Sequence, residues 1–442
     1  MKASKYNIFW DLDNSKKIAF NSMTCALAEV DDSFFNILNN IRNLVYEELT
    51  EEQKELVDNM LLGNYIVKDE INELKKIKFR HFAGKFSEER LTLVIAPTLS
   101  CNFACPYCYE NPKSGIMNKG IQNAIIGMVD KAAEEKKNIH ITWYGGEPLI
   151  AKDVLFSMSQ KMIEECDKWN VKYTSSIITN GYLINQEIIE KFRKSRITMF
   201  QITLDGPPYV HNQRRKLKNC DNGTFDVILN NIKELKANGL ENIAIRINTD
   251  KTNVNYIEEL LDILYQNGLN NLGIDVGHVQ AYNDVCASVS EACMDTEEYA
   301  LEDVKFREII LEKGFNTDKR FFYPGVKTNY CCADSIGSYV IDHEGNMYKC
   351  WNEIGDLQKS IGNILDMKEK TDIDTHMNNI DYMLWSPFEY QTCIDCNLLP
   401  ICMGGCPKLG IKDNLKPKCE KWKYNLEKVI KLTYENKMNY TE

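Results

Sequence analysis

The spacing of apolar residues after position 90 predicts a repeating strand–helix chain. Six short segments are β-branched and almost continuously apolar, which is typical of strands buried on both faces of a sheet. The segments between them carry apolar residues at every third or fourth position, as amphipathic helices do. The predicted strands are LTLVIAP, NIHITWY, SSIITN, MFQITL, IAIRIN and LGIDVG. The predicted helices are IQNAIIGMVDKAAEEKK, AKDVLFSMSQKMIEECDKW, TFDVILNNIKELKANG and NVNYIEELLDILYQNG.

Six strand–helix units in order predict a parallel sheet with right-handed crossovers, either doubly wound or forming part of a (β/α) barrel. Both folds gather their chemistry at the carboxyl ends of the strands. Unusual residues follow the first four predicted strands in this chain. In order, they are a cysteine triplet, the Gly145-Gly146-Glu147 turn, Asn180 and Asp205. We therefore expect the functional site at this end of the sheet.

The regions on either side of the six units have a different pattern. Before position 90, two short strands and several amphipathic helices outline a small winged-helix module, with a simple N-terminal extension as the alternative. Beyond position 320, short strands, glycine turns and cysteine pairs predict a small metal-stapled domain. The stretch EKWKYNLEKVIKLTYENK predicts a C-terminal helix.

Composition and charge narrow the class of protein. The chain has 442 residues, with 53 Lys and Arg against 64 Asp and Glu, which gives a formal net charge of −11. Such an acidic balance argues against a general nucleic-acid binder. No run approaches the ~18 apolar residues of a membrane span, and the N-terminus lacks the apolar core of a secretory signal. We therefore expect a cytoplasmic protein that binds neither nucleic acid nor membrane.

Cysteine is unusually frequent, with 16 residues in the chain. A reducing cytoplasm disfavours disulfides, so metal binding or redox chemistry is the default interpretation. The strongest motif is CNFACPYC, which places Cys101, Cys105 and Cys108 on one short loop. A [4Fe–4S] cube normally takes four thiolates, so three leave one iron open, as catalytic metal sites do. A zinc knuckle with a distant fourth cysteine is the alternative.

CNFACPYC, with Tyr107 before its third cysteine, and TWYGGEPLI together resemble the motifs of radical S-adenosylmethionine (SAM) enzymes. The resemblance implies a partial (β/α)6 TIM-like barrel in which the open iron binds the amino and carboxylate groups of SAM. It also implies that Gly145, Gly146 and Glu147 hold the methionine amino group. Further SAM contacts are expected near the ends of later strands, from Asn180, Thr203, Asp205 and Arg246. The alternatives are turn capping for Asn180 and Asp205, and a buried ion pair for Arg246.

The C-terminal cysteines resemble the seven-cysteine pattern of the SPASM domain, which carries two auxiliary [4Fe–4S] clusters. Transferred by position, auxiliary cluster I would use Cys332, Cys350 and Cys406. Auxiliary cluster II would use Cys393, Cys396, Cys402 and Cys419. Cys331 either completes cluster I or is a bystander that leaves an open iron. A pair of zinc ribbons is the alternative interpretation of these residues.

The resemblance divides the chain into four parts. Residues 1–88 are similar to the RiPP recognition element, a winged-helix module that captures the leader of a precursor peptide as an added strand. Residues 89–320 would form the radical SAM barrel, 321–425 the SPASM domain and 426–442 a C-terminal helix. The expected fold class is thus α/β, with an N-terminal winged-helix-like module and a cysteine-rich C-terminal domain.

The segment around Cys350 is most similar to peptide maturases that form thioether bridges, the sactipeptide and ranthipeptide class. The resemblance implies an oxidoreductase that cleaves SAM to a 5′-deoxyadenosyl radical and joins cysteine sulfur to carbon in a cysteine-containing precursor peptide. Its cofactors would be SAM and three [4Fe–4S] clusters. Its partners would be that peptide, bound through its leader, and a one-electron donor such as flavodoxin or ferredoxin.

Two alternatives stay open. The first is a different radical SAM product, either a carbon–carbon crosslink or formylglycine as in anaerobic sulfatase maturation. Enzymes of the sulfatase type carry an Asp base directly after the cysteine that corresponds to Cys350, where this chain has Trp351. The second is a metal-stapled regulator whose winged helix binds DNA, which the acidic charge disfavours.

Overall fold

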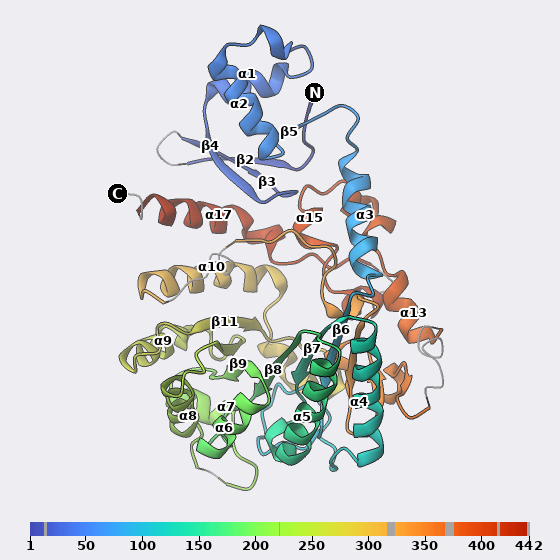
Figure 1. Ribbon diagram of the computed structural model, residues 1–442. Helices are drawn as coiled ribbons and strands as arrows, with labels where there is room; N and C mark the ends of the chain where they lie inside the picture. The colour runs from blue at the N-terminus through green and yellow to red at the C-terminus, as the bar shows by residue number, and fades with distance from the viewer. Residues whose placement is uncertain (13–15, 221, 316–322, 367–374, 413–415, 440–442) are drawn as a thin grey trace. The chain divides into compact units, whose positions relative to one another are not determined.

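The computed structural model describes residues 1–12, 16–220, 222–315, 323–366, 375–412 and 416–439 (Figure 1). The chain forms two compact units, each assembled from segments that are distant in sequence. One contains Met1–Phe86, Lys319–Cys331 and Trp385–Glu442, and the other contains Ser87–Asp318 and Cys332–Leu384. The expected boundary between residues 320 and 321 lies outside the described residues, and the four-part division stays a prediction. Within the described ranges, no helix is long and apolar enough to cross a membrane.

The second unit is built on a sheet with the strand order β11-β10-β9-β8-β7-β6-β12-β13-β14. Strands β6 to β11 are parallel and adjacent in chain order, which confirms the α/β fold that the strand–helix repeat predicts. The strands are β6 (Arg90–Ile95), β7 (Asn138–Trp143), β8 (Tyr173–Thr179), β9 (Ile197–Thr203), β10 (Ile243–Thr249), β11 (Gly273–His278), β12 (Ser338–Ile341), β13 (Asn346–Tyr348) and β14 (Gly362–Asn363).

The cysteine-rich region contributes strands to the same sheet. Strand β12 pairs in parallel with β6, and β13 and β14 continue the sheet in antiparallel pairs. Gly337 makes the close approach of β12 possible, because a Cβ atom there would overlap the Arg90 carbonyl oxygen. The part of this region from β12 to β14 therefore extends the parallel sheet, whereas the residues from Trp385 onward belong to the first unit.

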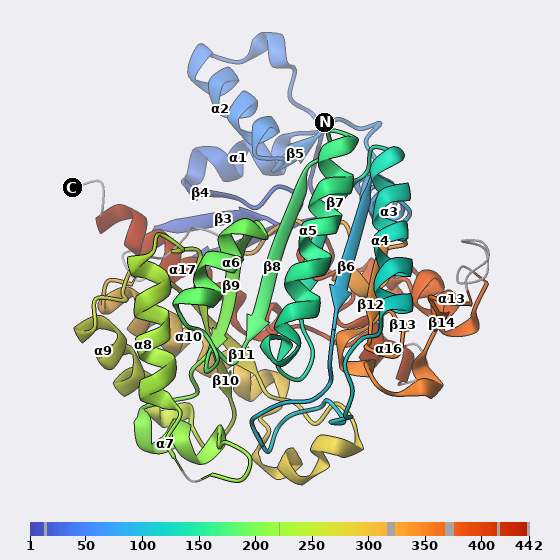
Figure 2. The same cartoon turned by 60° about the horizontal axis from the view of Figure 1, so that its bottom comes forward.

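Helices connect the parallel strands, and Figure 2 shows α4 and α5 along one face of β6, β7 and β8. Asn118 and Asn185 begin α4 and α6 by accepting a hydrogen bond from a first-turn N–H. The helices of this unit are α4 (Lys119–Glu134), α5 (Lys152–Lys168), α6 (Gln186–Lys194), α7 (Pro208–Arg214), α8 (Phe225–Ala237), α9 (Ile257–Gln266), α10 (Thr296–Glu312) and α13 (Met377–Leu384). Its 3₁₀ helices are η2 (Pro148–Ala151), η3 (Val254–Tyr256), η4 (Asp284–Ala292), η5 (Cys332–Asp334), η6 (Trp351–Glu353) and η7 (Leu357–Lys359).

The first unit contains an antiparallel sheet in the order β2-β3-β4 and a pair formed by β1 and β5. The sequence pattern predicts the hairpin of β2 and β3 but not β4. Asp31 and Thr50 cap α1 and α2, at the helix starts that the sequence predicts. The strands are β1 (Lys2–Ala3), β2 (Asn7–Asp11), β3 (Lys17–Asn21), β4 (Ala26–Val30) and β5 (Ile66–Val67). The helices are α1 (Asp32–Asn40), η1 (Tyr46–Glu48), α2 (Glu51–Leu62), α3 (Glu73–Lys85), η8 (Pro387–Glu389), α14 (Gln391–Ile394), α15 (Leu399–Cys402), α16 (Pro407–Lys412) and α17 (Trp422–Asn439).

Both faces of the β2-β3-β4 sheet are covered. On one face, Ala19 packs in a buried apolar cluster with Phe34 of α1. On the other face, Phe20 packs with Ile401 of α15 and Ile430 of α17. Neighbouring residues of β3 thus point into two separate cores, as the alternation of side chains along a strand requires. The N-terminal sheet is in this way fixed to the C-terminal helices of its own unit.

Candidate functional site

Cys101, Cys105 and Cys108 lie half-buried on the loop that follows β6, at the carboxyl end of the sheet. Burial raises the pKa of Cys101 to about 12, and it also raises the pKa of Cys105 and Cys108. An electrostatic contribution from Cys105 also raises the pKa of Cys101 and of Cys108, and all three cysteines lie within the segment 101–108. Crowded thiols of this kind become thiolates when a metal centre binds them. The donor set therefore fits an iron–sulfur group.

Across the described ranges of the chain, no three His, Cys, Asp or Glu side chains converge as ligands of a single metal ion. The ligands of a [4Fe–4S] cube need not converge in this way, because each thiolate binds a different iron atom. A zinc site instead surrounds one point with four ligands. The spread of the three thiols is compatible with a cube.

The Gly145-Gly146 turn packs directly on the backbone of the cysteine loop. A Cβ atom on Gly145 would overlap the Thr98 carbonyl oxygen, and one on Gly146 would lie 2.5 Å from the Ser100 carbonyl oxygen. Gly145 also has a φ of 110°, a conformation that residues with side chains rarely adopt. The Gly146 N–H donates to the Thr98 carbonyl at 3.3 Å. Both glycines are therefore needed to seat the turn against the residues just before the first cysteine.

The Glu147 side chain is fully buried, and backbone and side-chain donors of neighbouring segments surround its carboxylate. Its oxygens accept hydrogen bonds from the N–H of Leu149 at 3.0 Å, the N–H of Asn180 at 2.8 Å and the Thr179 hydroxyl at 2.8 Å. Its own N–H donates to the Ser100 carbonyl at 3.0 Å. Burial raises the pKa of the Glu147 carboxyl, and the three bonds it accepts oppose that shift. Glu147 thus ties the ends of β7 and β8 to the cysteine loop.

Asn180 connects the end of β8 to the same loop. Its side-chain carbonyl accepts a hydrogen bond from the Tyr182 N–H at 2.9 Å, and its amide donates to Asn102 Oδ1 at 2.7 Å. The Asn102 Nδ2 atom is buried and has no hydrogen-bond partner in the part of the chain that the structure describes. A buried amide donor beside Cys101 fits a ligand oxygen, because an unpaired polar atom is costly to bury.

Tyr107 is clamped at the centre of a polar network. Its hydroxyl donates to Asp205 Oδ2 and accepts a hydrogen bond from the Arg215 guanidinium at 2.7 Å. Asp205 Oδ1 accepts the Asn248 N–H at 2.8 Å, and the guanidinium carbon of Arg214 lies 5.1 Å from the Tyr107 ring centroid. Burial raises the pKa of Tyr107 well above its ordinary value, so the hydroxyl keeps its proton. The cysteine loop is thereby held to the ends of β9 and β10.

Arg246 forms an ion pair, as the alternative to a SAM contact expected, but the Arg246 side chain is 28% exposed and that of Asp275 is 44% exposed, so the pair is not buried. Its guanidinium lies 2.7 Å from Asp275 Oδ2 and donates to Asn248 Oδ1 at 3.1 Å. Gly277 leaves room for it, because a Cβ atom there would overlap the guanidinium. Thr203 is buried at the end of β9, the strand that pairs with β10 at Arg246. The contacts of Arg246 and Thr203 with SAM stay predictions.

Aromatic residues link the cysteine loop to the segment after β13. The hydroxyl of Tyr109, the residue after Cys108, shares a hydrogen bond with that of Tyr144. The Tyr144 ring packs on Trp351, with centroids 5.2 Å apart. The Trp351 indole N–H points to Cys332 Sγ at 3.2 Å. Trp351, at the position where sulfatase-type enzymes carry a base, thus contributes an indole against a cysteine.

The remaining predicted cysteine ligands divide between the two units. Cys332 and Cys350 belong to the second unit, and the first unit contains Cys331, Cys393, Cys396, Cys402, Cys406 and Cys419. In the first unit, burial raises the pKa of Cys393 to about 12. Negative charge on Cys402, Cys396 and Cys419 adds to that shift. The four cysteines expected to bind auxiliary cluster II therefore belong to the same unit, and the other three influence Cys393 electrostatically.

Three residues of the site carry only weak signals in the sequence. Arg214 and Arg215 are an arginine pair after the Asp205 turn, a pattern common on protein surfaces, yet both side chains are buried. Tyr144 precedes the two glycines directly, and its position beside a motif is the only indication of a role. Their partners lie too far along the chain to be recognised from spacing.

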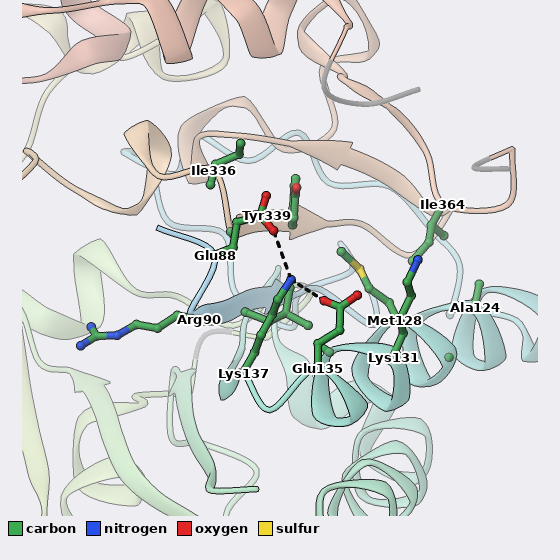
Figure 3. Close-up of a pocket in the computed structure, with 14 residues that line it drawn as sticks. Glu88, Arg90, Ala124, Met128, Lys131, Glu135, Lys137, Ile336, Tyr339 and Ile364 are labelled. Carbon is green, nitrogen blue, oxygen red and sulfur yellow. Dashed lines mark ion pairs between the residues drawn. The ribbon is translucent and has the colours of Figure 1, made fainter. Parts of the chain in front are cut away.

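A cavity of about 400 Å³ lies at the opposite end of the sheet (Figure 3). It is lined by Arg90, the first residue of β6, and by residues of α4 and β12. Beside it, Lys137 pairs with Glu135 at 2.6 Å and with Glu88 at 3.8 Å. The cysteine loop follows the other end of β6, so the length of this strand separates the cavity from the candidate site.

Residues 95–264 match the family model of the radical SAM superfamily. This segment is therefore similar to a radical SAM domain. The matched residues run from the end of β6 into α9 and include the cysteine triplet and the Gly145-Gly146-Glu147 turn. SAM and a [4Fe–4S] cluster are the cofactors typical of this superfamily. The match confirms the resemblance at superfamily level and favours an enzyme over a metal-stapled regulator.

Two relatives are similar to this chain over most of their own length. The radical SAM cyclopropyl synthase TigE of Paramaledivibacter caminithermalis is 24% identical over 91% of this chain and 89% of TigE. A cysteine-type anaerobic sulfatase-maturating enzyme of Clostridium novyi is 26% identical over 78% of this chain and 96% of its own.

Two solved structures show the same fold. anSMEcpe with bound AdoMet and Cp18Cys peptide matches with a TM-score of 0.64 at 18% identity, covering 79% of this chain and 98% of that one. Streptococcus suis SuiB bound to precursor peptide SuiA matches with a TM-score of 0.56 at 17% identity, covering 95% and 98%. The radical SAM partial barrel is thus confirmed, with a small N-terminal sheet module and a cysteine-rich C-terminal region.

Proposed function

We propose that this radical SAM domain binds a [4Fe–4S] cluster through Cys101, Cys105 and Cys108, and SAM at the open iron. The observation that carries the proposal is the set of three half-buried thiols within the segment 101–108, on the loop at the carboxyl end of β6. The Gly145-Gly146 turn against the same loop supports it. When bound, the cluster supplies the electron that splits SAM into methionine and a 5′-deoxyadenosyl radical.

The chain's own residues position and shield this chemistry. The Glu147 carboxylate is already satisfied by donors of the chain, so we assign it to positioning and the backbone of Gly145 and Gly146 to the SAM ammonium group. The unpaired Asn102 amide is proposed to donate to an oxygen of SAM. The further contacts proposed for SAM are Asn180, Thr203, Asp205 and Arg246.

Exchange of the first cysteine tests the cluster assignment. Cys101→Ala should abolish SAM cleavage and remove up to about four iron atoms per chain under anaerobic conditions. Cys220→Ala is the matched control, because Cys220 is exposed and lies outside every proposed ligand set. Production of 5′-deoxyadenosine at the wild-type rate by Cys101→Ala would show that the assignment is wrong.

We also propose two auxiliary [4Fe–4S] clusters. Auxiliary cluster I is assigned to Cys332, Cys350 and Cys406, with Cys331 as the candidate fourth ligand. Auxiliary cluster II is assigned to Cys393, Cys396, Cys402 and Cys419, which the mutual influence of these thiols supports. Three cubes contain about twelve iron atoms per chain. Stoichiometric zinc without iron in anaerobically purified protein would contradict all three assignments.

The proposed substrate is a cysteine-containing precursor peptide. The solved structures of anSMEcpe with Cp18Cys peptide and of SuiB with SuiA support a peptide substrate for this fold. Among the described residues, β4 is an outer strand that pairs with β3, and its other edge is proposed to take up a leader peptide as an added strand. A groove of about 860 Å³ opens at the end of β4, between α1 and α2, and offers room for leader side chains.

The proposed product is a thioether between a cysteine sulfur and a carbon of the peptide. The carbon gives one hydrogen atom to the 5′-deoxyadenosyl radical, which becomes 5′-deoxyadenosine. The thiol loses a proton, and the remaining electron passes to the enzyme as the carbon–sulfur bond forms. Mass spectrometry of the treated peptide should therefore show the loss of two hydrogens per bridge, together with one thiol that resists alkylation. A peptide with Ser in place of Cys is the control.

A carbon–carbon crosslink is the second candidate, and the similarity to the cyclopropyl synthase TigE over 91% of this chain favours it. It also removes two hydrogens, but it leaves every thiol of the peptide open to alkylation, so the same measurement separates the two products. Formylglycine formation is less compatible with the site, because Trp351 places an indole against Cys332 where the resemblance expects a carboxylate base.

A further inference from the structure

Helix α3 (Glu73–Lys85) of the first unit exposes phenylalanines along one side. Phe79 is 74% exposed, Phe82 36%, and Phe86, the residue after the helix, 44%. The rings of Phe82 and Phe86 stack with their centroids 6.3 Å apart. Spacings of three and four residues place all three on one face of the helix. Single exposed apolar residues are ordinary on a protein surface, but a contiguous row of rings indicates an interaction site.

Two exposed lysines lie beside these phenylalanine rings. Lys75 and Lys78 are exposed on the same side of α3, and the Lys78 ammonium lies 5.9 Å from the Phe82 ring centroid. The single acidic residue of the helix, Glu73, is buried on the other side. This surface is therefore cationic, on a chain whose net charge is −11. We call the surface made by Lys75, Lys78, Phe79, Phe82 and Phe86 the α3 face.

The opposite side of α3 packs toward the cysteines assigned to auxiliary cluster II. Ile77 is buried in an apolar cluster with Leu399 and Met403, and Cys393 packs against that cluster. The α3 face and Cys393 therefore lie on opposite sides of a helix about 10 Å across and the apolar cluster beneath it. All of these residues belong to the first unit.

We propose that the α3 face docks a small acidic one-electron carrier protein. The inference rests on the proposed function, in which SAM cleavage takes up one electron and bond formation returns one to the enzyme, so that a carrier is needed to deliver the electron that starts the cycle. Carboxylates of the carrier would surround Lys75 and Lys78, and an apolar patch of the carrier would cover the phenylalanine rings. The opposite charges would speed the encounter of the two proteins, and the buried rings would supply binding energy. In the transfer, the carrier is oxidised by one electron and the enzyme is reduced by one, and no atom moves.

Charge and position together favour a carrier over other occupants. A cationic surface on an acidic chain is complementary to an acidic partner. A leader peptide or an anionic membrane has no need of a surface close to Cys393. An electron carrier does, because electron transfer requires a short path between donor and acceptor.

Binding without turnover is the direct test. Oxidised flavodoxin is titrated into the anaerobic holoenzyme by calorimetry, at low and at high salt. We expect the Kd of Lys75→Glu/Lys78→Glu to exceed the wild-type value by about tenfold or more at low salt, and the wild-type affinity to fall with added salt. Phe79→Ser should also weaken binding while keeping both lysines.

The matched control reverses the charge of two lysines that lie outside the α3 face. Lys161 and Lys194 are exposed on α5 and α6, and their double change to Glu alters the net charge equally. We expect the Kd of this control to stay within about twofold of the wild-type value, because charges beyond a Debye length of the interface are screened. Equal weakening in both double variants would show a net-charge effect and overturn the proposal.

SAM cleavage separates failure of the docking proposal from failure of the proposed function. With dithionite as reductant, Lys75→Glu/Lys78→Glu and wild type should cleave SAM equally. With limiting reduced flavodoxin, the variant should be slower. If wild type does not cleave SAM with dithionite, the proposed function fails. If it does, but flavodoxin binds both proteins alike or neither, the docking proposal is wrong. Weaker binding of the precursor peptide with unchanged flavodoxin affinity would assign the α3 face to the peptide and also overturn it.

Discussion

Replacing Glu147 with glutamine tests whether its carboxylate serves the chain or the ligand. The two oxygens accept the N–H groups of Leu149 and Asn180 and the Thr179 hydroxyl, all at 2.8–3.0 Å. Glutamine has the same shape, but it offers one acceptor oxygen and turns an NH₂ donor toward the remaining donors. At least one buried N–H therefore loses its partner in Glu147→Gln.

The size of the effect follows from these contacts. A buried donor left without a partner costs about 1–3 kcal/mol, and each bond that persists loses about 1 kcal/mol because its acceptor is no longer charged. Opposing this, the amide is cheaper to bury than the carboxylate, whose pKa burial raises. We expect a net loss of about 2–3 kcal/mol, which corresponds to about 30- to 150-fold in a local opening equilibrium.

Hydrogen exchange followed by mass spectrometry measures this loss locally. Peptides that contain the Leu149 and Asn180 amides should exchange faster in Glu147→Gln by the factor given above, and peptides from the first unit should be unchanged. Glu190→Gln is the matched control, because Glu190 is exposed on α6 and its change should cost less than about 0.5 kcal/mol.

SAM affinity decides the interpretation. If the carboxylate positions the chain, Glu147→Gln should weaken SAM binding only as far as the loop loosens, and faster exchange should accompany it. Unchanged protection of both amides, together with a large loss of SAM affinity, would refute the reasoning. That outcome would place the carboxylate on the SAM ammonium group, as the family resemblance implies.

Two further changes test the packing around the site. Gly146→Ala should lower the free energy of unfolding, measured in urea, by about 1–3 kcal/mol, because the new Cβ atom would lie 2.5 Å from a carbonyl oxygen. The control is Gly127→Ala in α4. Its Cβ atom would meet open space, so this change should raise the free energy of unfolding by about 0.5–1 kcal/mol. Burial lowers the pKa of His211 well below its ordinary 6.5, so the folded chain binds this proton more weakly and loses stability as pH falls below 6.5, by at most about 1.4 kcal/mol per pH unit. His211→Asn keeps an acceptor for the Asp205 N–H and should remove that part of the acid sensitivity, which urea unfolding at a series of pH values measures.

The parallel sheet is predictable because its signals are local. Each strand from β6 to β11 is a short apolar run between amphipathic helices, and burial on both faces makes the run nearly continuous. The starts of α1 and α2 are also local, since Asp31 and Thr50 bond to backbone N–H groups three residues away. Such features depend on neighbours in the chain and can be recognised without the fold.

The pairings that complete the fold are not local. Strand β12 is four residues long and joins β6 at Ser338 and Thr92, although nothing in its side chains selects one sheet edge over another. Tyr107 and Arg215 meet across 108 positions of the chain. The sequence pattern misses strand β4 for a similar reason. Its five residues, Ala26–Val30, form a strand by pairing with β3, and this pairing cannot be recognised from the five residues alone.

The candidate site divides in the same way. The spacing of the cysteine triplet is a local feature of one loop, so it can be recognised from the sequence. The hydrogen bonds of the Glu147 carboxylate cannot, because they depend on where β8 ends beside β7. Gly146 presses on Ser100, and Glu147 bonds to Ser100 and Asn180, so both act on the segment just before Cys101. A change at either residue therefore shifts the cysteine loop before it alters any contact with SAM. Loss of activity in such a variant cannot by itself identify a SAM ligand, and only affinity and local protection measured together distinguish the two roles.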